Sequence, residues 1–269
     1  MKRRVWWIIA SVILVIGIGF LLFPPVSNSI GKLKSNAAAD ALDRQKDSVI
    51  DSFVTDDGEE ITTAEEAIEA GCTDENGRPV TPDGLSVMFQ EDIERLKADS
   101  IAYNEWLKTH QGEYETTQYE NAVFLMEDYG VYDGVYCYLE APAIGLRLPV
   151  YLGASEYLMS YGAAHLYGTS LPVGEGSFNA AVAGHTGYIG RIFFDDLRSL
   201  QTGDEVSVTT YWGADHYRVA DTMTVSQDDY GPLMIQEGRQ LLTLITCIYD
   251  GEGGFDRYLV ICEKTKQQQ

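Results

Sequence analysis

The second half of the chain is a succession of short runs with the composition of β-strands. Several of these runs are rich in β-branched and aromatic residues. The runs cover residues 136–140, 146–151, 180–183, 205–210, 217–225, 241–246 and 257–263, with short helical or turn-like crossings at 155–161, 191–200 and 232–236. Seven or eight such strands predict a mostly β fold that closes into a β-barrel.

The run at 241–246 ends immediately before Cys247. It is apolar with interleaved threonines, which is typical of a buried strand, so Cys247 is expected at a strand end. The loop at 248–256 contains three glycines, and the next run begins with Arg257. A hairpin-like return therefore brings the Arg257 guanidinium beside the sulfur of Cys247.

A thiol with its ordinary pKa of about 8.5 is mostly protonated at neutral pH, so a nucleophilic cysteine needs a proton acceptor or a neighbouring positive charge. Of the four histidines, His185 is the best partner, because it follows an apolar run in the glycine-framed sequence AGHTG. Arg257 stays charged, which suits it to stabilising an oxyanion and not to accepting a proton. His185 then takes the proton-transfer role.

Each of these residues also has a structural interpretation. A cysteine at the end of an apolar strand is often inert and buried, and a strand arginine often pairs with a carboxylate. Cys72, Cys137 and Cys262 lack the glycine-rich loop and the following arginine. If Cys247 is free, at least one of these three is also unpaired, so a disulfide framework is not expected.

The order His185, Cys247, Arg257 and the sequences around these residues resemble the sortase family. The matching pieces are AGHTG at 183–187, TLITC at 243–247, YLEAPAIG at 138–145, LPVYLG at 148–153 and HLYGTSLP at 165–172. The resemblance covers about residues 138–263, is most similar to the class C, pilin-polymerising branch, and rests on several motifs in the right order.

The resemblance implies an eight-stranded sortase barrel and a cysteine transpeptidase. Its substrate would be an LPxTG-like sorting signal of a surface protein or pilin, cleaved through a thioacyl intermediate on Cys247, with Thr246 as a substrate-binding residue. The amine acceptor would be a pilin lysine or a peptidoglycan cross-bridge of a Gram-positive cell wall. No cofactor is implied.

Three departures leave pilus assembly and cell-wall anchoring both open. The segment from Gly112 to Val135 contains no proline, so the Asp-Pro-aromatic lid motif of class C enzymes is absent, and the acidic-aromatic cluster at 127–129 is expected to be a surface loop. An open groove is expected in consequence. The loop at 248–256 lacks a proline, and the tail at 264–269 is polar, with no second span.

The apolar run from Val5 to Phe23 contains no charge. At about 1.5 Å per residue it is long enough to cross a hydrocarbon core of about 30 Å. The basic residues at 2–4 predict a cytoplasmic amino terminus and an extracellular remainder. An uncleaved signal anchor is favoured over a cleaved signal peptide, because the run exceeds the usual 7 to 15 residues. Residues 1–36 therefore form the cytoplasmic tip, the span and a linker at 24–36.

Residues 37–135 are expected to form a helical region, with helices at 37–52, 63–70 and 87–110. Thr63 and Glu66 form a capping box at the second helix. Residues of about 55–85 form an acidic insertion, interpreted as a solvated excursion or as a contact for a partner. Its acidic residues lack the spacing of a calcium loop, so no metal site is expected. The catalytic barrel at 136–263 and a tail at 264–269 complete the chain.

The formal net charge of −22 argues against nucleic acid or an anionic bilayer as an electrostatic partner. Two other functions remain as alternatives. A cysteine peptidase of another fold would share the Cys/His pair, although papain-like enzymes place the histidine after the cysteine. A catalytically inactive surface-binding module would need no reactive thiol.

Overall fold

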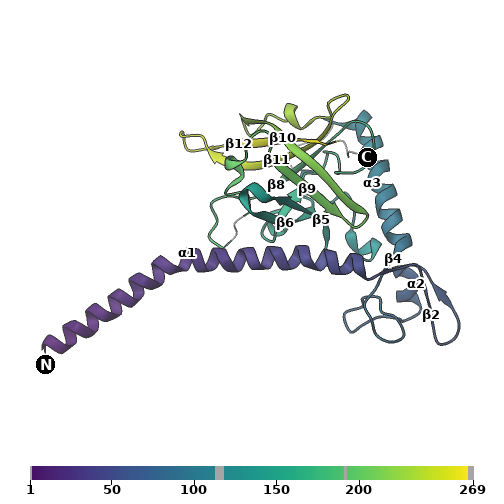
Figure 1. The fold of residues 1–269 in the computed structure, drawn as a ribbon, viewed down its shortest axis with the longest axis horizontal. Helices are drawn as coiled ribbons and strands as arrows, with labels where there is room; N and C mark the ends of the chain where they lie inside the picture. The colour runs from purple at the N-terminus through teal and green to yellow at the C-terminus, as the bar shows by residue number, and fades with distance from the viewer. Residues whose placement is uncertain (1, 113–117, 191–192, 266–269) are drawn as a thin grey trace.

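Eight strands form a closed barrel in the computed structural model, which describes residues 2–112, 118–190 and 193–265 (Figure 1). They are β5 Val135–Ala141, β6 Leu146–Leu152, β7 Ala163–His165, β8 Phe178–Ala183, β9 Glu205–Thr210, β10 Gly213–Val225, β11 Gln240–Tyr249 and β12 Phe255–Lys264. The order around the barrel is β10-β12-β11-β8-β7-β6-β5-β9. The predicted eight-stranded β-barrel is confirmed.

Large buried side chains of these strands form the hydrophobic core. Tyr136, Phe178 and Tyr217 are among the largest fully buried residues. Each such side chain contributes about 1.5–3 kcal/mol of burial free energy. β7 was not predicted: it runs parallel to β6 and antiparallel to β8, and these pairings define it as a strand.

The crossings between strands contain short helices, which are α4 Glu156–Met159, η3 Pro142–Ile144, η4 Leu197–Ser199 and η5 Gly231–Leu233. Three of the four lie within or at the edge of the predicted crossings. The Ser155 hydroxyl oxygen caps α4 by accepting a hydrogen bond from the Leu158 amide at 3.3 Å.

The amino-terminal helix α1 runs without interruption from Lys2 to Asp47. The expected linker at 24–36 is therefore wrong, since this segment is helical, and the helix expected at 37–52 is the end of α1. Pro24 and Pro25 lie inside α1, where each removes a backbone donor and favours a kink. Figure 1 shows α1 bending partway and then running beneath the barrel.

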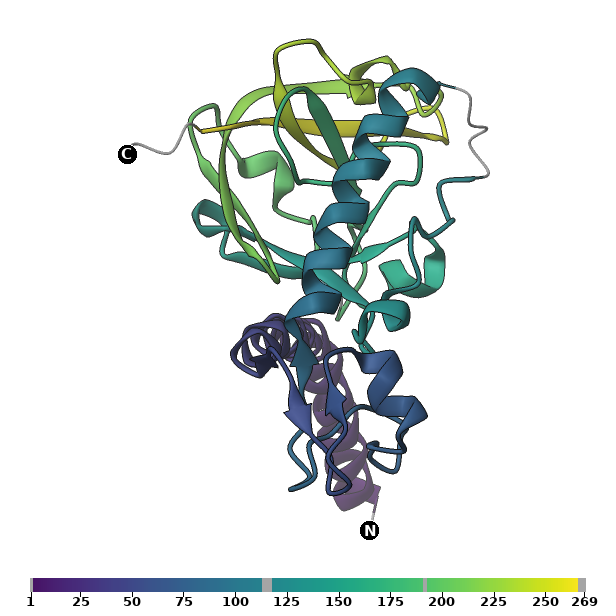
Figure 2. The same ribbon diagram turned by 90° about the vertical axis from the view of Figure 1, so that its right-hand side faces the viewer.

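Helix α3, Gln90–His110, lies along one side of the barrel (Figure 2). Its buried face includes Ile93, Leu96 and Leu107. The Asn104 amide donates to the Leu171 and Val173 carbonyls at 2.8 and 2.9 Å and ties the helix to the loop before β8. The helix begins later than expected because residues 88–89 form a short strand, β4 Met88–Phe89.

Residues 48–89 form a small lobe beside the end of α1 (Figure 2). It contains β1 Val49–Ile50, β2 Phe53–Val54, β3 Glu60–Ile61, α2 Ala64–Glu69 and β4, with β1 paired to β4 and β2 to β3. A separate apolar cluster that includes Ile61, Ala67 and Phe89 fills it. The acidic segment is therefore a packed unit and not only a solvated excursion.

The Thr63 hydroxyl oxygen caps α2 by accepting from the Glu66 amide at 3.2 Å. The Glu66 carboxylate accepts from the amide of Thr62, one residue earlier than the capping box predicts.

The segment at 126–129 is not the surface loop that we expected. It forms η2, Met126–Tyr129, and both of its terminal residues are buried. The Tyr129 hydroxyl donates to the Asp99 carboxylate at 2.8 Å, and the Arg95 guanidinium lies 4.6 Å from the Tyr129 ring centre. Burial and the Asp99 carboxylate raise the pKa of Tyr129. The segment belongs to the packing between α3 and the barrel.

Candidate active site

Cys247 and Arg257 face each other across the hairpin of β11 and β12. The antiparallel register pairs the two residues, and Arg257 Nη1 donates to Cys247 Sγ at 3.3 Å. Residues 241–246 of β11 are buried, and the strand reaches the surface at Cys247. The hairpin return predicted from the sequence is confirmed, and it gives the thiol a cationic neighbour.

His185 lies on the other side of Cys247. Strand β8 runs parallel to β11 with Ala183 opposite Ile245, and the next residue, Gly184, donates its amide to the Ile245 carbonyl at 3.0 Å. If this register is extended by two residues beyond the end of β8, His185 lies opposite Cys247. Neighbouring strands are about 4.8 Å apart, so the loop that begins with Gly184 and His185 leaves β8 beside the end of β11 that carries Cys247.

The main chain around His185 is held by close packing. A Cβ atom at Gly184 would lie 2.7 Å from the Phe194 ring, so only glycine fits there. The Phe194 amide donates to the His185 carbonyl at 3.0 Å. The Tyr188 and His185 ring centres are 4.8 Å apart. These contacts fix the start of the loop in which the imidazole lies.

Thr246 joins the two strands that carry the cysteine and the histidine. Its side chain is buried, and its hydroxyl donates to the Gly184 carbonyl at 2.8 Å. Thr246 also lines the cavity beside Cys247. Substrate binding by Thr246 stays a prediction, and the hydrogen bond adds a positioning role.

The hairpin loop beyond Cys247 is organised by Asp250. Its carboxylate accepts from the Glu252 and Gly254 amides at 2.7 and 2.9 Å, and these bonds lower the pKa of Asp250. Gly251 and Gly253 have φ values of 85° and 104°, which favour glycine. The glycine-rich sequence is therefore a tight turn that returns the chain to Arg257.

A cavity of about 260 Å³ opens beside the cysteine. Cys247 and Arg257 lie in its wall together with apolar residues such as Leu166, Leu233 and Leu259. A concave site with mostly apolar walls and a few polar groups is typical of a ligand-binding site.

Two aromatic residues in the cavity wall were not found from the sequence. The ring centres of Tyr119 and Tyr230 are 5.3 Å apart, and burial raises the pKa of Tyr119 to about 12. Glu120 lines the cavity as well. Both Tyr119 and Glu120 come from the segment between Gly112 and Val135, which lacks the Asp-Pro-aromatic lid motif. This segment therefore forms part of the cavity wall through other residues. No local pattern marks these positions, because they meet only in the folded chain.

The remaining cysteines and His165 have structural environments. Burial raises the pKa of the Cys137 thiol, and it raises that of Cys262 to about 12. All four cysteines are free. His165 is buried, and its Nε2 lies 2.9 Å from the Ser170 carbonyl and 3.1 Å from the Thr169 carbonyl. Carbonyls only accept, so Nε2 carries the hydrogen.

Among the residues that the structure describes, no group of three or more histidine, cysteine, aspartate or glutamate side chains is arranged to hold a metal ion. One described helix, α1, is long and apolar enough to cross a membrane.

Comparisons with known proteins point to one family. The family model of the sortase domain matches residues 139–265. Sortase C-1 from Actinomyces oris is 32% identical with a TM-score of 0.56, over 65% of this chain and 99% of that chain. Pilus-related sortase C of Group B Streptococcus is 28% identical with a TM-score of 0.57, over 66% of this chain and 91% of that chain.

A curated relative, sortase A of Bacillus anthracis, is 28% identical over 110 residues, which is 41% of this chain. The match spans half the length of that relative. The closed barrel and these matches define the class of protein, which is a sortase. The chain belongs to the sortase family, and the similar solved structures named above are class C sortases.

Proposed function

We propose that the chain is a membrane-anchored sortase that cleaves an LPxTG-like sorting signal and transfers the acyl group to an amine. Cys247 is the nucleophile, His185 transfers protons and Arg257 stabilises charge. The observation that carries this proposal is the 3.3 Å contact between Arg257 Nη1 and Cys247 Sγ, with His185 two residues beyond the end of the neighbouring strand β8.

In the first half-reaction, the Cys247 thiolate attacks the carbonyl carbon between threonine and glycine, forming the C–S bond. Arg257 stabilises the negative oxygen that develops, in a site where fixed donors count for more than in water. When the C–N bond breaks, protonated His185 delivers its proton to the leaving amine. The product is a thioester on Cys247.

In the second half-reaction, an incoming amine attacks the thioester carbon and the C–S bond breaks. Neutral His185 accepts the proton that the amine loses, and the thiolate is restored beside Arg257. The chemistry is balanced without a cofactor. The acceptor is a pilin lysine or a peptidoglycan cross-bridge amine. The similarity to class C sortases favours the pilin lysine.

Helix α1 supports a location of the enzyme at the cell membrane. Its apolar first half and the basic residues before it favour a cytoplasmic amino terminus and a catalytic domain outside the cell. The partners would be surface proteins or pilins that carry the sorting signal. Nucleic acid is not among them, given the net charge of −22.

The test uses the full chain in detergent with a fluorescence-quenched LPxTG peptide, with and without an added amine. Cleavage between threonine and glycine, and ligation of the amine to the threonine, should both occur. Both products should vanish in Cys247→Ala and His185→Ala. Cys72→Ala, which removes a partly exposed thiol far from the cavity, is the matched control. Product formation by Cys247→Ala would overturn the proposal.

A further inference from the structure

The helix that carries the candidate membrane span meets the barrel soon after the span ends. The apolar run ends at Phe23, and the Asn28 side-chain oxygen accepts a hydrogen bond from the Gly190 amide at 2.8 Å. At 1.5 Å per residue, about 7.5 Å of helix axis separates Phe23 from Asn28. Gly190 ends the segment that begins at His185. The histidine loop therefore touches α1 just beyond the end of the apolar run.

The contact at Gly190 is tight. The residue has a φ of +82°, and a Cβ atom there would collide with the Ser27 hydroxyl. Only glycine satisfies both conditions. The loop and the helix are packed together there.

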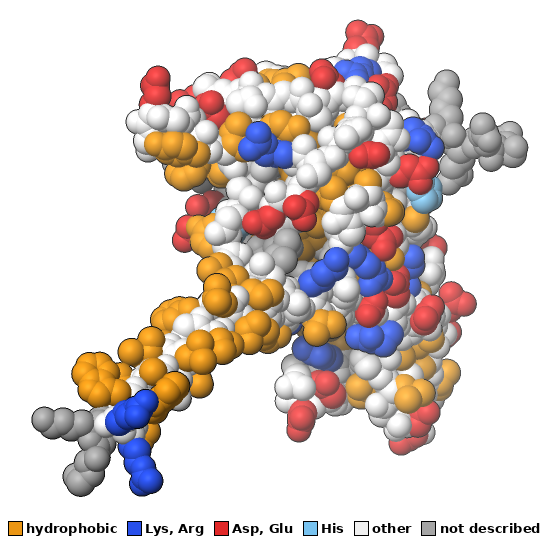
Figure 3. All heavy atoms as spheres, turned by 60° about the vertical axis from the view of Figure 1, so that its left-hand side comes forward, with side chains coloured by type: hydrophobic (Ala, Val, Ile, Leu, Met, Phe, Trp, Pro, Cys, Tyr) orange, Lys and Arg blue, Asp and Glu red, His pale blue; other side chains and the backbone are white. Residues whose placement is uncertain are grey.

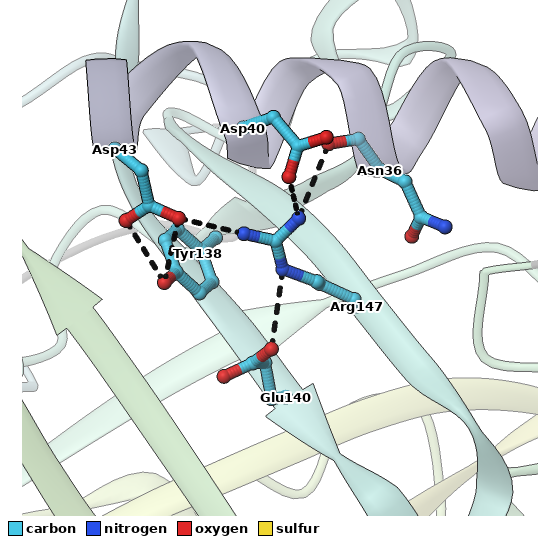
Figure 4. Close-up of polar contacts among 6 residues, drawn as sticks. All are labelled: Asn36, Asp40, Asp43, Tyr138, Glu140 and Arg147. Carbon is cyan, nitrogen blue, oxygen red and sulfur yellow. Dashed lines mark hydrogen bonds and ion pairs between the residues drawn. The ribbon is translucent and has the colours of Figure 1, made fainter. Parts of the chain in front are cut away.

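The rest of α1 is fastened to the barrel by Arg147 of β6 (Figure 4). Its guanidinium pairs with the carboxylates of Asp40, Asp43 and Glu140, the last two at 2.8 and 3.1 Å. It also lies 4.7 Å from the ring centre of Tyr138. Burial alone would lower the pKa of Arg147, but its interactions with Asp40 and Tyr138 outweigh burial and raise the pKa. Helix and barrel thus form one unit, so the direction of the span sets which part of the barrel faces the membrane.

The histidine loop presents two consecutive large apolar side chains. Tyr188 is 49% exposed and Ile189 is 56% exposed. On α1, Val26 and Ile30 flank the contact and are exposed as well. Figure 3 shows the apolar side chains of α1 continuing up to the place where the helix meets the barrel. The exposed apolar surface of the span therefore continues onto the histidine loop.

The charges of this part of α1 suit a membrane surface. Between Arg4 and Asp40 the charged residues are Lys32 and Lys34, although the whole chain carries −22. Lysine side chains extend toward headgroups, and tyrosine is favoured at the boundary between hydrocarbon and water. The contact would be mainly hydrophobic, since an acidic barrel is not attracted electrostatically to an anionic bilayer.

We propose that Tyr188 and Ile189 insert into the interface of the phospholipid bilayer that α1 crosses, so that the His185 loop rests on the membrane surface. Because the Tyr188 ring lies 4.8 Å from the His185 ring, the bilayer contact adjoins the reacting groups. The active site then works beside the bilayer, where sorting signals held in the same membrane are presented. The inference rests on the membrane anchor of the proposed function.

The test is photo-crosslinking of the full chain in phosphatidylcholine and phosphatidylglycerol vesicles. Benzoylphenylalanine replaces Ile189 in one variant, Leu14 of the span in a second and Leu85 in a third. Leu85 is a matched control, being 61% exposed but located in the small lobe at the other end of α1. Lipid adducts, found by mass spectrometry, are expected at Leu14 and Ile189, and at least tenfold fewer at Leu85.

The controls separate this inference from the proposed function. Peptide cleavage by each variant in the same vesicles shows that the barrel is folded. If the Ile189 variant does not cleave the peptide, a variant with the same probe at Tyr188 takes its place. Adducts at Leu14 with none at Ile189 overturn the inference and leave the anchor and the activity intact. An absence of adducts at Leu14 overturns the anchor and the inference together. A protein adduct in place of a lipid adduct at Ile189 also overturns it.

Discussion

At the scale of single residues, the reactivity of Cys247 depends on its place at the end of a buried run. The six residues before it are buried, while Cys247 itself is partly exposed in the cavity wall. A thiol deeper in β11 would be as inert as Cys262, whose pKa burial raises to about 12. Where β11 leaves the core, Arg257 of β12 lies within hydrogen-bond distance of the Cys247 sulfur.

Replacing Arg257 should lower the rate of acyl transfer without unfolding the barrel. Arg257→Ala should reduce kcat/KM for peptide cleavage by about 10²- to 10³-fold, since it removes a donor to the developing oxyanion. Arg257→Lys should recover part of the loss, because it keeps the charge but not the planar fork. Arg218→Ala, at an exposed ion pair with Glu205, is the control. Wild-type kcat/KM in Arg257→Ala would contradict the assigned role.

Gly190→Ala should impair catalysis from outside the active site. The new methyl group would collide with Ser27 and push the His185 loop away from α1. Gly187→Ala is the matched control, because it has the same φ of +82° but nothing within 4 Å of its Cβ position. A larger fall in kcat for Gly190→Ala, partly restored by Ser27→Gly, is expected in steady-state kinetics. Equal effects of the two substitutions would show that the helix contact is unimportant.

At the scale of elements, the sequence predicted those features that residues close together in the chain encode. Seven strands were predicted because each has its own short β-like run in the sequence. β7 was missed because Ala-Ala-His has no such pattern, and its pairing with β6 and β8 makes it a strand. Cys247 and Arg257 were predicted together because a single hairpin joins them. Tyr119 and Tyr230 were not, since they come from segments far apart in the chain.

His165 on β7 should make stability depend on pH. Burial lowers the pKa of this histidine from 6.5 to about 4, so the unfolded chain binds a proton that the folded chain excludes between these pH values. The free energy of unfolding should therefore fall as pH drops from 6.5 to 4, by on the order of 3 kcal/mol from this group.

The measurement is urea denaturation across that pH range. His165→Gln, which does not titrate, should show a shallower fall than the wild type. His216→Gln, at an exposed histidine of β10, controls for the loss of an imidazole. Parallel curves for the wild type and His165→Gln would rule out the effect.

At the scale of the whole molecule, α1 connects the membrane to the catalytic barrel. Two adjacent prolines suggested a break, but the helix continues through them because its second half is held against the barrel. Arg147 makes this contact through Asp40 and Asp43 of α1, and no local sequence pattern predicts an interaction between residues about a hundred positions apart. Tertiary packing therefore decides the conformation here, and helix propensity does not.

Breaking the Arg147 cluster should loosen α1 from the barrel. Arg147→Ala leaves Asp40, Asp43 and Glu140 facing one another without a cation, and the loss should be about 1 kcal/mol, or roughly fivefold in local opening. Hydrogen exchange of the amides at 36–47 should accelerate by that factor. Arg239→Ala, which removes an exposed pair with Glu263, should leave these amides unchanged. Unchanged exchange in Arg147→Ala would mean that apolar packing alone docks the helix.

The central claim, that Cys247 carries the acyl group between two substrates, is tested by capturing the intermediate. The full chain is mixed with an LPxTG peptide, quenched in acid during turnover and digested for mass spectrometry. The account predicts an acyl adduct on Cys247 that neutral hydroxylamine releases and that added amine depletes. Turnover with no adduct, or an adduct on any other residue, would contradict it.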